Sequence, residues 1–185
     1  MPINRRHLWL GLPFIATGLG GIGFYKILTH MQAGTYNPHA LPSPLIGKRP
    51  PAFTLPGAAG LQGFSNTDLL ALSHPVLINW FASWCEPCRQ EAGVLRNLAD
   101  SGIAIWGIAY EDSASALTNY LQKFGNPYQR LAVDQSGLTA INWGVYGVPE
   151  TYFIDKAGII RLRYAGPMSD DMVKHVIMPM IRQYS

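Results

Sequence analysis

The sequence predicts a mixed α/β fold that follows a membrane-spanning helix, and three observations lead to this expectation. From residue 52 onward, apolar strand-like runs alternate with segments of helical spacing. The two cysteines, Cys85 and Cys88, stand at the start of one such helix, directly after an apolar run. Ahead of this domain, residues 8–28 are almost uncharged. With 185 residues and 48% hydrophobic side chains, the chain can build one core and is not expected to be disordered.

Each element of the domain is predicted from its own pattern. The continuous apolar run Val76–Phe81 is typical of a strand buried on both faces. Asp155–Gly158 is typical of a hairpin turn, and Pro179 is expected to kink the last helix. Strands are predicted at residues 52–55, 76–81, 103–110, 131–133, 151–154 and 159–164. Helices are predicted at residues 66–72, with a cap at 66–68, and at 85–98, 113–124 and 169–183, with a turn or short helix at 136–142.

Residues 8–28 are interpreted as an uncleaved transmembrane anchor. At about 1.5 Å per residue the run spans a hydrocarbon core of ~30 Å. Its one charged residue, Lys26, is close enough to the end to reach the membrane interface. Arg5 and Arg6 precede the run, which places residues 1–7 in the cytoplasm and the domain outside.

The alternative for this run is a cleaved secretory signal peptide, and in that case the domain is still exported. Met31 and Ala33 would have to occupy the positions before the cut, where they make a poor cleavage site. Residues 29–51 are expected to form an extended tether, and residues 52–185 the folded domain. The tether is expected to be non-helical because of its prolines, which are Pro38, Pro42, Pro44, Pro50 and Pro51.

The charge distribution argues against nucleic acid as a partner. The net charge of +3 comes entirely from residues before Lys48, and from there on the basic residues equal the 11 acidic residues in number. A protein that binds phosphate backbones needs a basic face. A neutral domain does not offer one.

Four interpretations compete for the segment Trp84–Cys88, which reads W-C-E-P-C. A zinc site lacks further ligands, because the histidines show none of the paired spacing that such sites use. Covalent haem attachment needs a histidine where Arg89 stands. A purely structural disulfide would close a very short loop and add less than about 2 kcal/mol. A reactive dithiol is therefore favoured, and no metal and no cofactor are expected.

The position of the cysteines suits thiol–disulfide exchange. Cys85 lies at a helix N-terminus, where free backbone N–H groups and the helix dipole favour a thiolate. Cys88 lies one turn further on and can resolve a mixed disulfide. Pro87 fits the first turn, where its missing N–H costs nothing, and Trp84 is expected to pack beside the pair and limit solvent. An ordinary buried aromatic is the alternative for Trp84. A C-x-x-C at this place in an α/β pattern predicts a thioredoxin-like fold.

A second element lies at Gly147–Thr151, directly before a predicted strand. In a thioredoxin-like fold this position faces the C-x-x-C and carries a cis proline, here Pro149. We expect Pro149 to block metal access, and the backbone of Val148 to pair with an extended peptide substrate.

Two stretches resemble the periplasmic thiol:disulfide interchange proteins of cytochrome c maturation, the DsbE/CcmG family. They are residues 77–91, L-I-N-W-F-A-S-W-C-x-x-C-R-x-E, and residues 144–155, G-V-Y-G-V-P-E-T-Y-F-I-D. General thioredoxins carry a buried aspartate six residues before the first cysteine. This chain has Asn79 there, as the family does.

The resemblance implies an acidic active site around Glu91 and Glu150. Because Asn79 is neutral, these two carboxylates are the candidates for proton transfer and for tuning the pKa of the thiols. The alternative for Glu91 is a solvated helix glutamate, and for Glu150 it is a role in ordering the loop after Pro149. Glu86 departs from the family pattern and is expected to be exposed.

The resemblance further implies a function and partners. The protein would be anchored in the bacterial inner membrane as a single-pass protein with a periplasmic domain. It would reduce disulfides of apocytochrome c, directly or with a CcmH-type maturation partner, and take electrons from a membrane donor of the DsbD/CcdA type. Two alternatives stay open: a general extracytoplasmic reductant of the TlpA/ResA kind, and a non-catalytic module that binds C-x-x-C-H peptides.

Overall fold

The computed structural model describes residue 21 and residues 43–184 of the protein. Within residues 43–184, a five-stranded mixed sheet has the order β5-β4-β3-β6-β7. β3 pairs in parallel with β4 and β4 with β5, while β6 is antiparallel to both β3 and β7. The strands are β3 (Val76–Phe81), β4 (Ile105–Tyr110), β5 (Arg130–Asp134), β6 (Glu150–Ile154) and β7 (Ile160–Ala165).

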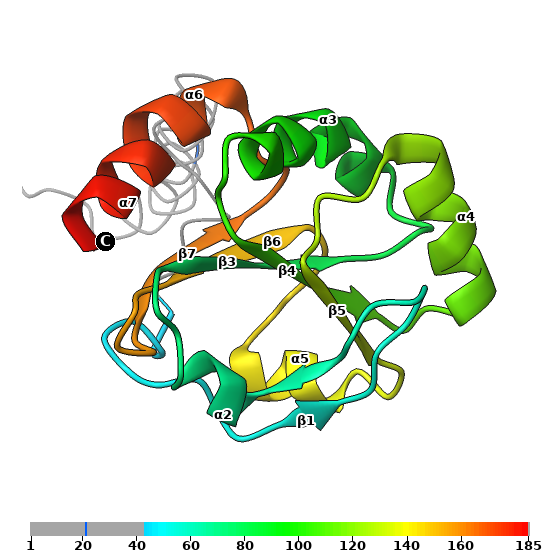
Figure 1. Ribbon diagram of the computed structural model, residues 1–185, viewed down its shortest axis with the longest axis horizontal. Coiled ribbons are helices and arrows are strands. Elements are labelled where there is room, and N and C mark those ends of the chain that lie inside the picture. The colour runs from blue at the N-terminus through cyan, green and yellow to red at the C-terminus, as the bar shows by residue number, and fades with distance from the viewer. Residues whose placement is uncertain (1–20, 22–42, 185) are drawn as a thin grey trace, which may run out of the picture. The chain divides into compact units, whose positions relative to one another are not determined.

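Helices cover both faces of this sheet (Figure 1). One face carries α3 (Glu86–Asp100), α4 (Ala114–Phe124) and a C-terminal helical segment made of α6 (Asp170–Met172), η1 (Val173–Ile177) and α7 (Met178–Tyr184). The other face carries α2 (Asn66–Leu69), α5 (Leu138–Trp143) and a small hairpin of β1 (Thr54–Leu55) and β2 (Phe64–Ser65). This is the mixed α/β architecture that the sequence predicts.

Strand β3 contributes to the core on both sides of the sheet, because all six of its residues are buried. Leu77 and Phe81 belong to the cluster beneath α3 and α4. Ile78 and Trp80 point to the opposite cluster, where the Trp80 ring meets Trp143 edge-on with centroids 5.7 Å apart. A polar residue on such a strand has no access to water, so Asn79 must find its hydrogen-bond partners inside the protein.

The outer edge of β5 is covered by the loop that joins β1 to β2. The N–H of Val133 donates to the carbonyl oxygen of Pro56 at 3.0 Å, and the N–H of Leu131 donates to that of Gln62 at 3.1 Å. The loop is tight, since a Cβ at Gly57 would lie 2.2 Å from a backbone oxygen across it. Two backbone donors of the edge strand are thereby satisfied within the domain.

The predicted element order is confirmed, with small shifts at most boundaries. The strand at residues 76–81 matches its prediction, and the other four sheet strands shift by one or two residues. The predicted strand at 52–55 is reduced to β1, and its partner β2 was not anticipated. The helix expected to reach residue 72 ends at Leu69, and its N-cap is Ser65 rather than residues 66–68. The Ser65 N–H donates to the Asp68 carboxylate at 2.8 Å, which fixes the start one residue earlier.

The irregularity expected at Pro179 takes the form of the π-helical turn η1, directly before α7. The N–H of Met178 donates to the carbonyl oxygen of Val173, five residues earlier. A proline ring crowds the carbonyl four residues before it and offers no N–H, so a wider turn at this point relieves the conflict.

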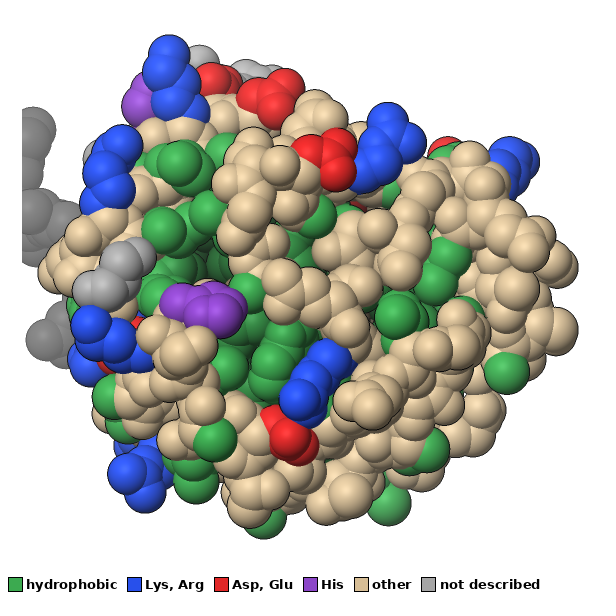
Figure 2. Space-filling model, viewed as in Figure 1, with side chains coloured by type: hydrophobic (Ala, Val, Ile, Leu, Met, Phe, Trp, Pro, Cys, Tyr) green, Lys and Arg blue, Asp and Glu red, His purple; other side chains and the backbone are tan. Residues whose placement is uncertain are grey.

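Lys and Arg side chains are dispersed over the face of the molecule that Figure 2 shows, rather than gathered in a stripe. This agrees with the equal numbers of basic and acidic residues from residue 48 onward.

The predicted anchor at residues 8–28, apart from Gly21, and the tether up to residue 42 lie outside the described residues. Among the residues described, no helix is both long and apolar enough to cross a membrane.

Candidate active site

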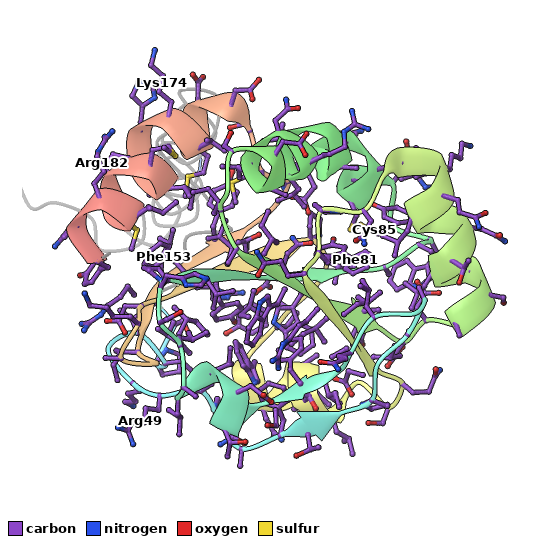
Figure 3. All side chains as sticks on the ribbon, viewed as in Figure 1. Arg49, Phe81, Cys85, Phe153, Lys174 and Arg182 are labelled. Atoms are coloured by element: carbon purple, nitrogen blue, oxygen red, sulfur yellow. A yellow bond between two sulfur atoms is a disulfide. The ribbon has the colours of Figure 1, made fainter. Side chains whose placement is uncertain are left out.

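The cysteine pair lies where the central strand passes into α3. Cys85 is the N-cap residue of α3, and its Sγ accepts a hydrogen bond from the N–H of Cys88 at 3.1 Å. The two sulfurs form a disulfide of 2.06 Å. Cys85 lies on the same side of the sheet as α3 and α4, near Phe81 (Figure 3). The predicted placement of Cys85 at a helix N-terminus, with Pro87 in the first turn, is confirmed.

The two cysteines differ in their surroundings. Cys85 is 4% exposed and Cys88 is 1% exposed. The carbonyl oxygen of Cys88 accepts a hydrogen bond from the Tyr120 hydroxyl at 3.0 Å, which ties the first turn of α3 to α4. Cys88 is thus the more enclosed of the two, as its predicted role as the resolving thiol requires.

The loop that faces the cysteines contains the predicted cis proline. The peptide bond between Val148 and Pro149 is cis. The carbonyl oxygen of Val148 lies 3.5 Å from the Sγ of Cys85. The backbone of the loop therefore lies beside the Cys85 sulfur, which is the atom that would exchange with a substrate disulfide.

Trp84 is more exposed than the sequence indicated. Its side chain is 56% exposed, so the interpretation as an ordinary buried aromatic is wrong. The indole ring meets Tyr110 edge-on with centroids 6.4 Å apart, and its Nε1 donates to the carbonyl oxygen of Glu111 at 3.4 Å. Trp84 therefore packs against the end of β4, and much of its ring is exposed to solvent next to Cys85 in the chain.

Glu91 lies inside the protein, on α3 and three residues after Cys88. It is 1% exposed, so its interpretation as a solvated helix glutamate is wrong. Its Oε2 accepts from the N–H of Met168 at 2.6 Å, and its Oε1 accepts from the Asn79 amide at 2.9 Å. Burial raises the pKa of the Glu91 carboxyl to about 7, although these two hydrogen bonds oppose the shift. A carboxyl with this pKa can exchange a proton near neutral pH.

Asn79 is the centre of the buried polar network around Glu91. The Tyr128 hydroxyl donates to its Oδ1 at 2.7 Å, and its Nδ2 donates to the hydroxyl of Thr151 at 3.2 Å as well as to Glu91. A hydroxyl bonded to the amide oxygen leaves the amide NH₂ facing the carboxylate. Sequence reasoning missed Tyr128, because it lies 49 residues from Asn79 with no local motif around it.

Glu150 is buried and fully paired. The Arg163 guanidinium donates to both carboxylate oxygens, with Nε to Oε2 at 2.8 Å and Nη2 to Oε1 at 2.7 Å. Oε1 also accepts from the N–H of Tyr146, at 2.9 Å, and the Tyr146 ring covers the guanidinium 4.6 Å from the ring centroid. Glu150 therefore holds the loop that leads to Pro149, and its effect on the thiols stays a prediction. Sequence reasoning missed Arg163, which reaches Glu150 from the neighbouring strand β7.

Glu86 is exposed, as expected. It forms an ion pair with Arg89 one turn further along α3, at 2.8 Å, with 67% of its side chain in solvent. An exposed pair of this kind contributes little stability.

These groups together can perform dithiol exchange. A sulfur at a helix N-terminus supplies the thiolate, and a second thiol one turn on can displace a bound partner. A buried carboxyl that titrates near neutral pH lies on the same helix. The backbone of the facing loop contacts the first sulfur.

Comparison with known proteins agrees with this chemistry. Residues 46–163 match the AhpC/TSA family. The chain is 42% identical over 148 residues to the thiol:disulfide interchange protein DsbE of Pseudomonas fluorescens biotype C, covering 80% of this chain and 82% of the relative. It is 36% identical over 167 residues to the thiol:disulfide interchange protein HelX of Rhodobacter capsulatus, covering 90% and 91%.

A solved structure supports the fold. A secreted disulfide oxidoreductase of Mycobacterium tuberculosis, homologous to DsbE of Escherichia coli, aligns with a TM-score of 0.59. The two share 20% sequence identity, and the alignment covers 69% of this chain and 95% of the other. The chain therefore has a thioredoxin-like fold and belongs to the AhpC/TSA family, among the thiol:disulfide interchange proteins of the DsbE and HelX type.

Proposed function

We propose that this protein is a membrane-anchored reductant that keeps the cysteine pairs of apocytochrome c reduced outside the bacterial inner membrane. The observation that carries the proposal is the position of the Cys85 sulfur, which lies at the N-terminus of α3 and 3.5 Å from the Val148 carbonyl oxygen. The two motifs shared with the DsbE/CcmG family support the choice of substrate. An oxidising compartment supplies no reducing buffer, so electrons must be delivered to the protein. The resemblance to the DsbE/CcmG family points to a membrane donor of the DsbD/CcdA type.

The reaction uses the two cysteines in turn. The Cys85 thiolate attacks a substrate disulfide, forms a mixed disulfide and releases one substrate thiolate. Cys88 then loses its proton and attacks the Cys85 sulfur, which restores the Cys85–Cys88 disulfide and releases the second substrate thiolate. The substrate gains two electrons. Glu91, three residues after Cys88 on α3, is the group that accepts the Cys88 proton.

The surface around the site suits a protein substrate. Two of the large hydrophobic side chains that the described residues expose are Trp84 and Tyr146. Trp84 precedes the reactive cysteine, and Tyr146 lies in the loop that leads from α5 to Pro149. Exposed apolar groups beside a reactive site are typical of a surface that contacts another protein.

We expect Cys88→Ser to accumulate a mixed disulfide through Cys85 with an oxidised C-x-x-C-H peptide, because the resolving thiol is lost. Cys85→Ser should accumulate none, because the attacking thiol is lost. Mass spectrometry of the trapped adduct identifies the cysteine. An adduct through Cys88 would contradict the assignment.

The same peptide distinguishes the competing functions. Reduced wild-type protein should reduce the C-x-x-C-H peptide faster than an unrelated disulfide protein. Equal rates would favour a general reductant. Undiminished binding of the peptide by the Cys85→Ser/Cys88→Ser variant, without reduction by the wild type, would favour a binding module.

The Arg5 and Arg6 pattern predicts that the domain is exported. An alkaline phosphatase reporter, which is active only after export, should be active when fused after Ser185. Cell fractionation should find the fusion in the membrane. Activity of a reporter that functions only in the cytosol would contradict this topology.

Glu91→Gln should flatten the dependence of stability on pH. The pKa of Glu91 is raised from 4.5 to about 7 in the folded protein, so protonation of this carboxyl favours folding. The stabilisation is fully present below the unfolded value and is lost as the pH rises through about 7. That loss amounts to roughly 3 kcal/mol between these limits.

Urea unfolding of the wild type and of Glu91→Gln from pH 4 to 8 measures this difference. Glu86→Gln, which changes an exposed glutamate on the same helix, is the control and should follow the wild type. Parallel curves for the wild type and Glu91→Gln would refute the titration of Glu91 in this range.

Glu150→Gln should lower the pKa of the Cys85 thiol, by on the order of one unit. The substitution removes the anion that neutralises the Arg163 guanidinium, and the positive charge that remains favours the thiolate over the thiol. A more stable thiolate makes the protein more oxidising. Thiolate absorbance of the reduced protein, followed against pH, gives the pKa. An unchanged thiol pKa in a folded variant would leave Glu150 only the role of ordering the loop.

A further inference from the structure

Ser83 lies in the turn between β3 and α3, and it forms hydrogen bonds with residues on both sides of this turn. Its N–H donates to the Asp112 Oδ2 at 2.5 Å, and its hydroxyl donates to the Asp112 Oδ1 at 2.9 Å. On the opposite side, its carbonyl oxygen accepts from the Arg89 guanidinium at 3.0 Å. Ser83 lies two residues before Cys85, so these hydrogen bonds hold the backbone that leads into the reactive cysteine.

Asp112 comes from the end of the adjacent strand, just after β4. It is 5% exposed and receives a third hydrogen bond, from the N–H of Ser113 at 2.7 Å. All three groups that face it are donors, so the side chain must present two acceptor oxygens. An asparagine has only one, and its NH₂ would face a donor. Sequence reasoning assigned Asp112 no role.

The residue before Asp112 supports the same turn. Glu111 has a positive φ of 45°, and its carbonyl oxygen accepts from the Trp84 indole. Its own N–H donates to the carbonyl oxygen of Asp134, at the end of β5, at 3.0 Å. The adjacent pair Glu111 and Asp112 thus bonds the adjacent pair Ser83 and Trp84, which links the ends of three neighbouring parallel strands.

We propose that Asp112 is a positioning residue for dithiol exchange: through Ser83 it holds the Cys85 sulfur at the N-terminus of α3, within reach of Cys88 and beside the Val148 carbonyl. The proposal rests on the proposed function, because positioning matters only if the pair exchanges. The competing role is purely structural, in which Asp112 serves only to stabilise the start of α4.

The equilibrium of the cysteine pair with glutathione separates these roles. The constant for forming the Cys85–Cys88 disulfide reports how well the fold holds the two sulfurs together. Misplacing two reacting groups by about 1 Å can cost on the order of 100-fold in their effective molarity. We therefore expect Asp112→Asn to lower this constant about tenfold, and Ser83→Ala, which keeps the carboxylate and the backbone bond, to lower it about threefold. Alkylation of thiols in glutathione buffers measures each value.

Two further variants make the test specific. Ser83→Ala/Asp112→Asn should lower the constant no more than Asp112→Asn alone, because Asp112 acts through Ser83. Ser113→Ala is the matched control. It removes the hydroxyl that caps α4, at 3.2 Å from the N–H of Ala116, but leaves the backbone bond to Asp112 in place. It should be less stable to urea and keep the wild-type constant.

A folded Asp112→Asn with the wild-type constant would overturn the positioning role. If Asp112→Asn does not fold, the comparison of Ser83→Ala with Ser113→Ala decides, and equal constants for these two would overturn it. A wild-type protein that does not exchange with glutathione at all would instead overturn the proposed function itself.

Discussion

The rest of the structure depends on the burial of β3 on both faces. A strand that is in contact on four sides, through two faces and two sheet partners, admits almost no polar side chain, and its one polar residue must find its hydrogen-bond partners inside the protein. Asn79 meets this condition by bonding Tyr128, Thr151 and Glu91, which come from three other parts of the chain. The same strand delivers the chain to Cys85. The burial of β3 therefore determines the positions of the Cys85 thiol and of the Glu91 carboxyl as well as the packing of the core.

The two carboxylates that the sequence singles out, Glu91 and Glu150, lie in different environments. Glu91 has only neutral hydrogen-bond donors around it, so burial favours its protonated form. Glu150 has the Arg163 guanidinium and is held as a charged pair. Carboxylates with such different hydrogen-bond partners can take different tasks in one reaction. Here one group can carry a proton and the other can hold the loop around Pro149.

The sequence predicted what depends on local pattern. The buried strand 76–81 and the helix opened by Cys85 each have a signature within a few residues, and both are confirmed. The cis proline at Pro149 is also confirmed, but its prediction needs the C-x-x-C and the thioredoxin-like fold as well as the local sequence. The burial of Glu91 could not be predicted, because it depends on Met168, 77 residues away. The contacts of Arg163 and Asp112 are also set by which strands lie side by side. The exposure of Trp84 has the same origin, since the end of β4 supports the ring from one side only.

The loop that covers the edge of β5 has a consequence for behaviour at high concentration. A bare edge strand is a template on which another copy of the chain, or an unfolded client, can add a strand. In this protein, Pro56 and Gln62 already accept the hydrogen bonds of Val133 and Leu131, so an incoming chain would first have to displace them. Under the proposed function, in which the substrates are extended polypeptides, this covering keeps such chains from pairing with the sheet along the edge of β5.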